Sequence, residues 1–411
     1  MDSPTSPYRE RTTRGGQNVV VFALVRVYRT LCHGQSPLWL VANFMRNFSL
    51  VFLWLCVFKN AGLIPIEWRP AINVTILRDA DDFIFSGFSG LVCGVGLFAL
   101  SYPIAKHLYL SRPTPYAGEK AAPCNARSVS ITVSLLSTVW LSLNLAYLCI
   151  NYIVSALDIM AWLSYVIGHI SAPIITAVYL WLFAPPGICG LFGLALGLQN
   201  LAGVFTHLLF PTAPPWYNHL YGDQPGNYSI PGYAAGLTRV DIALGTHLHN
   251  DGFHMSPIVF GAFPSLHSAF VCLIFLFVSR YASWGGASWG WGLTRPTRNK
   301  DSPFSVLSLL PLGTAICVVY MVWQWWATMY LDHHYRLDLL GGGLYAILAF
   351  FIVFRRMKNH EDDFQNNPNK TTGGMRLFHG TIFARFFNSL ANPELDDYIL
   401  ASPSSSELDF V

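Results

Sequence analysis

Long apolar stretches alternate with polar segments along most of the chain. A helix that crosses a bilayer needs about 20 mostly apolar residues, and eight stretches approach that length. They cover residues 38–58, 83–103, 129–155, 159–184, 187–209, 264–282, 305–330 and 338–354. The pattern therefore predicts an all-α integral membrane protein with about eight transmembrane helices.

The composition supports this prediction and argues against other classes. Only 11% of the 411 residues are charged and 53% are hydrophobic, whereas soluble domains carry about 25% charged residues. The net charge of +3 and the lack of a basic run argue against nucleic-acid binding. The polar first residues predict no cleavable signal peptide. The eight cysteines have no metal-like spacing and are expected to be free thiols.

The basic residues indicate an orientation in the membrane. With a cytosolic N-terminus and eight alternating spans, 19 of the 25 Lys and Arg residues fall on the cytosolic side, in agreement with the positive-inside rule. Both termini are then cytosolic, and the loop of residues 210–263 is lumenal. Asn227 in this loop and Asn73 in the first lumenal loop begin glycosylation sequons.

The segment HHYRLD, residues 333–338, carries one half of a candidate catalytic site. His334 and Asp338 are four residues apart and share one face of a helix. The carboxylate can hold one imidazole nitrogen and leave the other free to attack a phosphorus atom. A single His–Asp pair at a helix start is also an ordinary cap and ion pair. The glycines at 341–343 allow either another helix or a substrate to approach closely.

The segment FPSLHS, residues 263–268, supplies the other half on the same side of the membrane. Pro264 suits the first turn of a helix, and free backbone N–H groups there, beside Ser265, attract phosphate. His267 follows near the membrane boundary, where it can act as general acid toward a departing alkoxide. Together the two segments predict chemistry on a lipid phosphate.

Other residues are weaker candidates. Arg239 and Asp241 have the charges to bind a phosphoinositol group, and a local ion pair is an equal alternative. The histidines at 247, 249 and 254 have no cysteine or clustered carboxylate beside them, which favours loop surface over a metal site. His169 and His207 are interpreted as packing histidines with satisfied hydrogen bonds.

PSLH, followed downstream by H-x3-D, resembles the second and third signatures of the type 2 phosphatidic acid phosphatase superfamily. Longer strings resemble one branch, the fungal inositol phosphorylceramide synthases that aureobasidin A inhibits. These strings are FPTAPPWYNHLYG (210–222), NYSIPG (227–232), GLTRVDIALG (236–245), SPIVFGAFPSLHSA (256–269) and WATMYLDHHYRLDLLGGG (326–343). The resemblance is dense between residues 200 and 345 and absent from both tails.

The resemblance implies a six-helix catalytic core of the phosphatidic acid phosphatase type 2 kind. We map this core onto residues 129–356, including the lumenal loop 210–263. Residues 1–36 then form a cytosolic arm, and residues 37–128 form two extra spans and a cytosolic loop. Residues 357–411 are expected to be a disordered cytosolic tail.

The resemblance also implies an activity, the transfer of phosphoinositol from phosphatidylinositol to the primary hydroxyl of ceramide with release of diacylglycerol. His334, oriented by Asp338, would form a phosphohistidine while His267 moves the proton, and neither a metal nor an organic cofactor is expected. The candidate substrate-binding residues are Ser265, Arg239, Asp241 and Arg336. Family analogy further implies a Golgi membrane, a lumenal site and a small membrane regulatory subunit.

Three alternatives stay open. They are a lipid phosphate or polyprenyl diphosphate phosphatase, a paralogue that acts on mannosylated ceramide, and a catalytically silent membrane scaffold or transporter. The phosphatases have Ser-Arg where this chain has Ala327-Thr328, which favours a transferase. Asp332 and Arg336 stand where the synthases have Thr and an apolar or aromatic residue. Their spacing predicts that they pair with one another; alternatively, Arg336 reaches the phosphate and the substrate differs.

Overall fold

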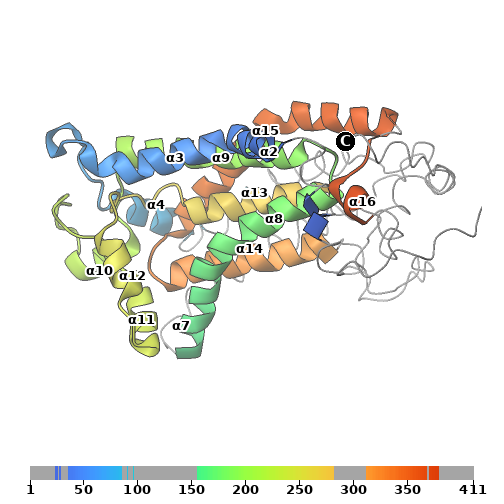
Figure 1. The fold of residues 1–411 in the computed structure, drawn as a ribbon. Coiled ribbons are helices and arrows are strands. Elements are labelled where there is room, and N and C mark those ends of the chain that lie inside the picture. The colour runs from blue at the N-terminus through green and yellow to red at the C-terminus, as the bar shows by residue number, and fades with distance from the viewer. Residues whose placement is uncertain are drawn as a thin grey trace, which may run out of the picture.

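The computed structural model describes residues 36–85, 155–281, 312–367 and 370–378, together with isolated positions at 24, 25, 27, 28, 90 and 96. Helices and their connecting loops make up these residues, and β-structure among them is limited to isolated bridges of Thr212 with Asn73 and Gly261. The long helices lie side by side, and the short helices α10–α12 gather at one end (Figure 1). The prediction of an all-α protein is confirmed.

The helices are α2 (Pro37–Asn47), α3 (Ser49–Asn60), α4 (Ile76–Phe85), α7 (Ser155–Trp162), α8 (His169–Phe183), α9 (Ile188–Leu209), α10 (Pro215–Tyr221), α11 (Leu237–Leu244), α12 (Leu248–His254), α13 (Leu266–Tyr281), α14 (Leu312–Tyr330), α15 (Arg336–Asn366) and α16 (Gly373–Phe378). Three short helical turns accompany them, η1 (Ala61–Leu63), η2 (Ile66–Trp68) and η3 (Leu163–Gly168).

Within the described residues, three helical segments are long and apolar enough to cross a membrane, namely Ala156–Phe183, Ile188–Leu209 and Arg336–Asn366. The bent pair α2–α3 makes a fourth if it is one span, and α13 is a shorter apolar helix. These elements coincide with predicted spans, and α14 covers the described part of another. The predicted spans 83–103 and 129–155 lie almost wholly outside the described residues, as do the N-terminal arm and the loop 103–128.

The first predicted span is broken instead of continuous. α2 and α3 meet at an angle of 65°, because Phe48 between them leaves the helical region with φ −108° and ψ 13°. Polar residues surround the break, where Arg46 donates to the Asn43 side chain and the Ser49 hydroxyl donates to the Arg46 carbonyl. The polar stretch inside the apolar segment is therefore where the helix changes direction.

The core of the bundle gathers apolar side chains from α8, α9, α13, α14 and α15. α13 packs directly against α15. A Cβ atom at Gly342 would lie 2.1 Å from the Ser265 carbonyl oxygen, and one at Gly341 would lie 2.4 Å from the Phe263 ring. The glycine triplet therefore serves the close approach of another helix, which is one of the two predicted alternatives. The cysteines at 56, 189, 272 and 317 are free, as predicted.

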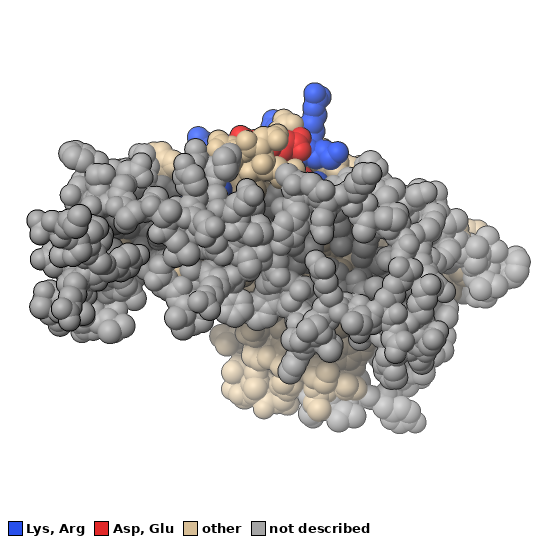
Figure 2. Space-filling model, turned by 90° about the vertical axis from the view of Figure 1, so that its right-hand side faces the viewer, with Lys and Arg blue, Asp and Glu red and all other residues tan. Residues whose placement is uncertain are grey.

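The last long helix extends further than the sequence predicted. α15 continues to Asn366 and α16 follows, so the expectation of disorder from residue 357 is wrong for 357–366 and 373–378. Met357 and Glu361 lie one turn apart on the buried face of α15, where Glu361 binds Arg280 of α13. Charged side chains gather on the outer side of this end, along the upper edge of Figure 2. Residues 379–411 lie outside the described residues.

Residues 210–263, the cap, fold over one end of the bundle. Trp216, Tyr217 and Phe260 form a small core of their own with Val74 from the preceding loop. α11 packs against α7 and shares a hydrophobic cluster with the end of α14. The cap thus covers the end at which α13 and α15 begin (Figure 1).

Candidate active site

The loop of residues 331–335, between α14 and α15, carries the predicted nucleophile. His334 Nδ1 lies 3.4 Å from Asp338 Oδ2, and the backbone N–H of Tyr335 donates to the same oxygen at 2.8 Å. Asp338 is fully buried in the first turn of α15. Because the carboxylate lies at Nδ1, Nε2 of His334 is the nitrogen left free, as the spacing predicted. Its role as nucleophile stays a prediction.

His267 lies in the first turn of α13, and its ring centroid is 5.9 Å from that of His334. The starts of the two helices are joined, because the Ser265 N–H donates to the Asp338 carbonyl at 3.0 Å. The Ser268 hydroxyl also donates to the Leu339 carbonyl at 2.6 Å. The structure therefore brings the two sequence motifs together beside two helix N-termini, whose partial positive charge favours an anion.

Ser265 is completely buried in this junction. Its hydroxyl oxygen accepts the backbone N–H of Ser268 at 3.3 Å, which is the contact of a helix N-cap. The structure thus gives Ser265 a structural role at the start of α13. Its role in substrate binding stays a prediction.

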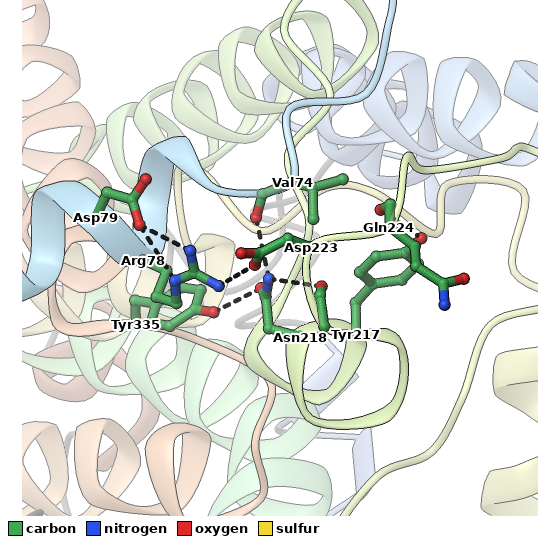
Figure 3. A network of polar contacts seen from close by, with 9 residues as sticks. Val74, Arg78, Asp79, Tyr217, Asn218, Asp223, Gln224 and Tyr335 are labelled. Carbon is green, nitrogen blue, oxygen red and sulfur yellow. Dashed lines mark hydrogen bonds and ion pairs between the residues drawn. The ribbon is translucent and has the colours of Figure 1, made fainter.

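Tyr335 anchors the loop of residues 331–335 to the cap (Figure 3). Its hydroxyl donates to Oδ1 of Asn218 at 2.8 Å, and Nδ2 of Asn218 donates to the Val74 carbonyl at 3.3 Å. Close by, Arg78 of α4 pairs with Asp223 of the cap. These contacts hold the residue next to His334 between α4 and α10.

The prediction that Arg336 pairs with Asp332 is wrong. Nε and Nη2 of Arg336 donate to Oδ2 of Asp81 at 2.9 and 2.7 Å, and the Leu337 N–H donates to Oδ1 at 3.0 Å. Asp332 precedes the helix in a left-handed conformation with φ 60°, and its carboxylate lies 3.7 Å from His219. The Asp81–Arg336 pair is buried and fastens α4 to the first turn of α15. This arrangement does not favour Arg336 as a phosphate ligand.

Arg239 of α11 pairs with a membrane helix instead of with Asp241. Its Nε donates to Oδ1 of Asp158 at 2.9 Å, and the Tyr330 hydroxyl donates to the same oxygen at 2.9 Å. Its guanidinium also lies 5.3 Å from the centre of the Tyr330 ring. Arg239 therefore ties α11 to α7 and α14.

Asp241 binds the start of α12. It accepts His249 Nδ1 at 2.6 Å and the Asn250 N–H at 3.0 Å. Burial alone would raise the pKa of Asp241, but hydrogen bonds from Asn250, His249 and Thr246 lower it to about 2. The predicted local pair of Arg239 with Asp241 is thus wrong, and each residue orders the cap through another partner. Phosphoinositol binding by either residue stays a prediction.

The loop histidines are not gathered around a metal. His249 serves Asp241, and across the described ranges no group of three or more His, Cys, Asp or Glu side chains could hold a metal ion.

His333 is enclosed by aromatic rings. It stacks between Tyr165 and Phe253, with centroid distances of 5.0 and 4.8 Å. Burial and the neighbouring His334 lower the pKa of His333 to about 3, so its imidazole is neutral. Of the two adjacent histidines, His334 has the carboxylate partner, which supports its assignment as the nucleophile.

Three side chains that sequence reasoning did not assign to the site surround His267. Tyr165 stacks on its ring at 4.1 Å and His169 at 4.4 Å, and the amide nitrogen of Gln324 lies 3.1 Å from Nδ1. Gln324 could have been found, because a polar residue inside an apolar span is a functional candidate. Tyr165 could not, because it sits in η3, a π-helical turn with no clear sequence signal.

His207 and His169 are both interpreted from the sequence as packing histidines with satisfied hydrogen bonds, and this is confirmed for His207 alone. His207 Nε2 bonds to the Pro264 carbonyl at 2.9 Å. His169 is different, because its buried Nδ1 has no hydrogen-bond partner among the described residues. It belongs to the surroundings of His267.

Comparison with known proteins agrees with this geometry. Residues 188–362 match the PAP2 superfamily model. Inositolphosphotransferase 1 of Saccharomyces cerevisiae is 32% identical over 90% of this chain and 100% of its own length. The chain belongs to the PAP2 superfamily.

Two further relatives are named as inositol phosphorylceramide synthases. The inositol phosphorylceramide synthase of Candida albicans is 32% identical over 73% of this chain and 46% of its own length. The synthase catalytic subunit aur1 of Schizosaccharomyces pombe is 37% identical over 73% of this chain and 51% of its own. This chain spans about half of each synthase, and no solved structure matches it. This PAP2 protein is an enzyme, a phosphotransferase of the sphingolipid inositolphosphotransferase type.

Proposed function

We propose that this enzyme transfers phosphoinositol from phosphatidylinositol to a sphingolipid hydroxyl through a phosphohistidine at His334. The observation that carries the proposal is the placement of His334, backed by Asp338, opposite His267 with 5.9 Å between ring centroids. This separation suits a phosphoryl group held between an attacking nitrogen and a group that handles the leaving oxygen.

The reaction has two balanced steps. First, Nε2 of His334 attacks phosphorus, the bond to the diacylglycerol oxygen breaks, and His267 gives its proton to that oxygen. Then His267 takes the proton of the acceptor hydroxyl, whose oxygen attacks phosphorus and displaces His334. No proton is consumed overall. The adjoining N-termini of α13 and α15 stabilise the phosphate charge, since Arg239 and Arg336 are committed to Asp158 and Asp81.

The acceptor that we propose is a mannosylated inositol phosphorylceramide. The supporting observation is coverage, because this chain spans all of Inositolphosphotransferase 1 but only about half of each synthase. The sequence motifs on their own pointed to ceramide. Ceramide is the second candidate, because the synthases match over 73% of this chain.

A transfer assay separates these acceptors. Purified protein in lipid nanodiscs is given phosphatidylinositol with ceramide, with mannosylated inositol phosphorylceramide, or with neither, and diacylglycerol and lipid products are measured by mass spectrometry. We expect diacylglycerol to match product one to one with the mannosylated acceptor. Product with ceramide alone would make the protein a synthase. Continuous release of inositol phosphate without any acceptor would make it a hydrolase.

We also propose a Golgi membrane location with the site on the lumenal side and a small membrane regulatory subunit, which the charge bias and the resemblance support. The sequons offer a test of orientation. Asn227 is exposed, whereas the Asn73 side chain is half-buried and donates to the Pro211 carbonyl. A glycosidase-sensitive mass shift that disappears in Asn227→Gln and persists in Asn73→Gln supports the lumenal placement of the cap. A shift that persists in Asn227→Gln and disappears in Asn73→Gln contradicts the preference for Asn227.

A further inference from the structure

Gln324 is a completely buried amide in the apolar helix α14. A polar group at this depth costs free energy unless it is hydrogen-bonded. Both ends of this amide are engaged. Its nitrogen donates to Nδ1 of His267 at 3.1 Å, and its oxygen accepts the hydroxyl of Ser164 at 2.6 Å. Gln324 therefore connects the catalytic imidazole to a hydroxyl on another helical segment.

The π-helical turn η3 supplies this hydroxyl. Ser164 is fully buried in it, and the next residue, Tyr165, stacks on His267 at 4.1 Å. π-Helical turns are rare and occur often at functional sites. In this fold the irregular turn presents two neighbouring side chains to the surroundings of one imidazole.

The proposed reaction requires His267 to change its protonation state. Nε2 can release a proton only while Nδ1 keeps one, because a neutral imidazole that loses its remaining N–H proton becomes a strongly basic anion. In the structure the amide nitrogen of Gln324, which can only donate, lies at Nδ1, and this orientation suits the tautomer in which Nδ1 is unprotonated and Nε2 carries the proton. The protonated form of Nδ1 needs an acceptor in the same place.

We propose that Gln324 is a positioning residue whose terminal amide turns over when His267 takes up a proton at Nδ1 and so becomes able to act as general acid at Nε2, and this inference rests on the proposed function. In one orientation, the one seen here, the amide nitrogen donates to Nδ1. In the other, the amide oxygen accepts Nδ1–H and the nitrogen donates to Ser164. A serine hydroxyl can donate or accept, so both orientations keep the Ser164–Gln324 and Gln324–His267 contacts.

Gln199 of α9 offers a matched control. It is also buried, at 1% exposure, but neither of its amide atoms has a hydrogen-bond partner within the described residues. Replacing Gln199 by Leu therefore removes a buried amide from the same bundle without touching the chain that holds His267.

The first test reads the imidazole directly and needs no lipid substrate. Protein labelled with ¹⁵N-histidine is placed in bilayers, and the ring nitrogens of His267 are assigned by solid-state NMR from the difference to His267→Asn. We expect unprotonated Nδ1 and protonated Nε2 in the wild type and in Gln199→Leu. In Gln324→Glu, which can only accept, Nδ1 should become protonated. Identical His267 signals in the wild type, Gln324→Glu and Gln324→Met would overturn the proposal.

The second test is kinetic. Gln324→Met keeps the side-chain length but offers no acceptor for Nδ1–H of the acid form, so kcat for diacylglycerol release should fall about 10- to 100-fold, with KM changed less than about twofold. Ser164→Ala should have a smaller effect. The double variant should match Gln324→Met alone, because Ser164 acts through Gln324. Additive losses, or an unchanged kcat in Gln324→Met with normal thermal stability, would contradict the chain.

The two tests separate the two proposals. A wild-type protein that shows the expected NMR signals but transfers no phosphoinositol would refute the proposed function alone. Normal transfer with unchanged His267 signals in the Gln324 variants would refute this inference alone.

Discussion

Two buried carboxylates at opposite ends of the helix bundle, Glu361 and Asp338, hold their partners in different ways. Where α15 finishes, Glu361 accepts Nε and Nη2 of Arg280 at 2.7 and 2.6 Å and the Tyr281 hydroxyl at 2.6 Å. At the catalytic end, His334 Nδ1 stands 3.4 Å from Asp338. The second oxygen of Asp338 has no hydrogen-bond partner among the described residues.

We interpret the short pair as a structural contact and the loose pair as a reactive one. A short bidentate pair fixes two elements in a single arrangement. A loosely held pair with a spare acceptor can tighten when a proton or a reacting group arrives. The variants below test whether the two ends respond as this comparison requires, from the largest expected effect to the smallest.

Replacing His334 by Ala should lower transfer by at least about 10³-fold, because the nucleophile is lost. Thermal stability should change little, since the pair it leaves is loose. The measurement is diacylglycerol release in nanodiscs. His333→Phe is the matched control, because a phenyl ring retains the stack between Tyr165 and Phe253. An active His334→Ala protein beside an inactive His333→Phe protein would move the nucleophile to His333.

Replacing Glu361 by Gln at the opposite end should destabilise the fold by about 3–5 kcal/mol, because Arg280 then stays buried without its carboxylate. Activity per folded molecule should not change. Thermal unfolding in detergent measures the loss. The double variant Arg280→Met with Glu361→Met should lose much less. If kcat of Glu361→Gln fell while stability held, the assignment of this end as structural would be wrong.

Asp81→Asn breaks a pair of the same kind at the catalytic end. It should lower stability and also reduce kcat about 10- to 100-fold, because the first turn of α15 carries Asp338 and a small displacement there is costly. Initial rates at saturating phosphatidylinositol check this. Both Glu361→Gln and Asp81→Asn remove the charge of a buried carboxylate that pairs with Arg. Only Asp81→Asn should lower kcat as well as stability. An unchanged kcat would show that the Asp81–Arg336 pair does not position the site.

Replacing Asp241 by Asn should give the smallest effect, a change in how the stability of the fold depends on pH. Hydrogen bonds within the cap lower its folded pKa to about 2, below the usual value of about 3.9. Its stabilising contribution is therefore present above about pH 4 and is lost as the pH falls toward 2. Asp241→Asn should lose about 1–3 kcal/mol at neutral pH and show a flatter stability curve between pH 4 and 2. Parallel curves for both proteins would contradict this.

The local geometry of the candidate site could be predicted from the sequence. His334 and Asp338 lie on one helical turn, and His267 follows a helix start, so each motif specifies its own geometry. The charge pattern predicted both motifs on one side of the membrane, and the structure brings them together. These features depend on residues a few positions apart, where helix geometry decides what meets.

The partners of the charged residues could not be predicted. Arg336 reaches Asp81, 255 positions away in the chain, and Arg239 reaches Asp158. Spacing favoured nearby carboxylates because it carries no information on which distant segments pack together. The prediction of where α15 ends was wrong for a similar reason. The residues after 357 are mostly polar, and one face of them is buried only because Arg280 of α13 lies opposite Glu361.

The site of the covalent intermediate tests the central claim most directly. Protein is mixed with phosphatidylinositol labelled in the inositol ring, without acceptor, and quenched under alkaline conditions that preserve phosphohistidine. The account predicts about one label per active site, on the peptide that contains His334, and its release when the sphingolipid acceptor is added before the quench. Labelled His333, or full turnover in His334→Ala, would contradict it.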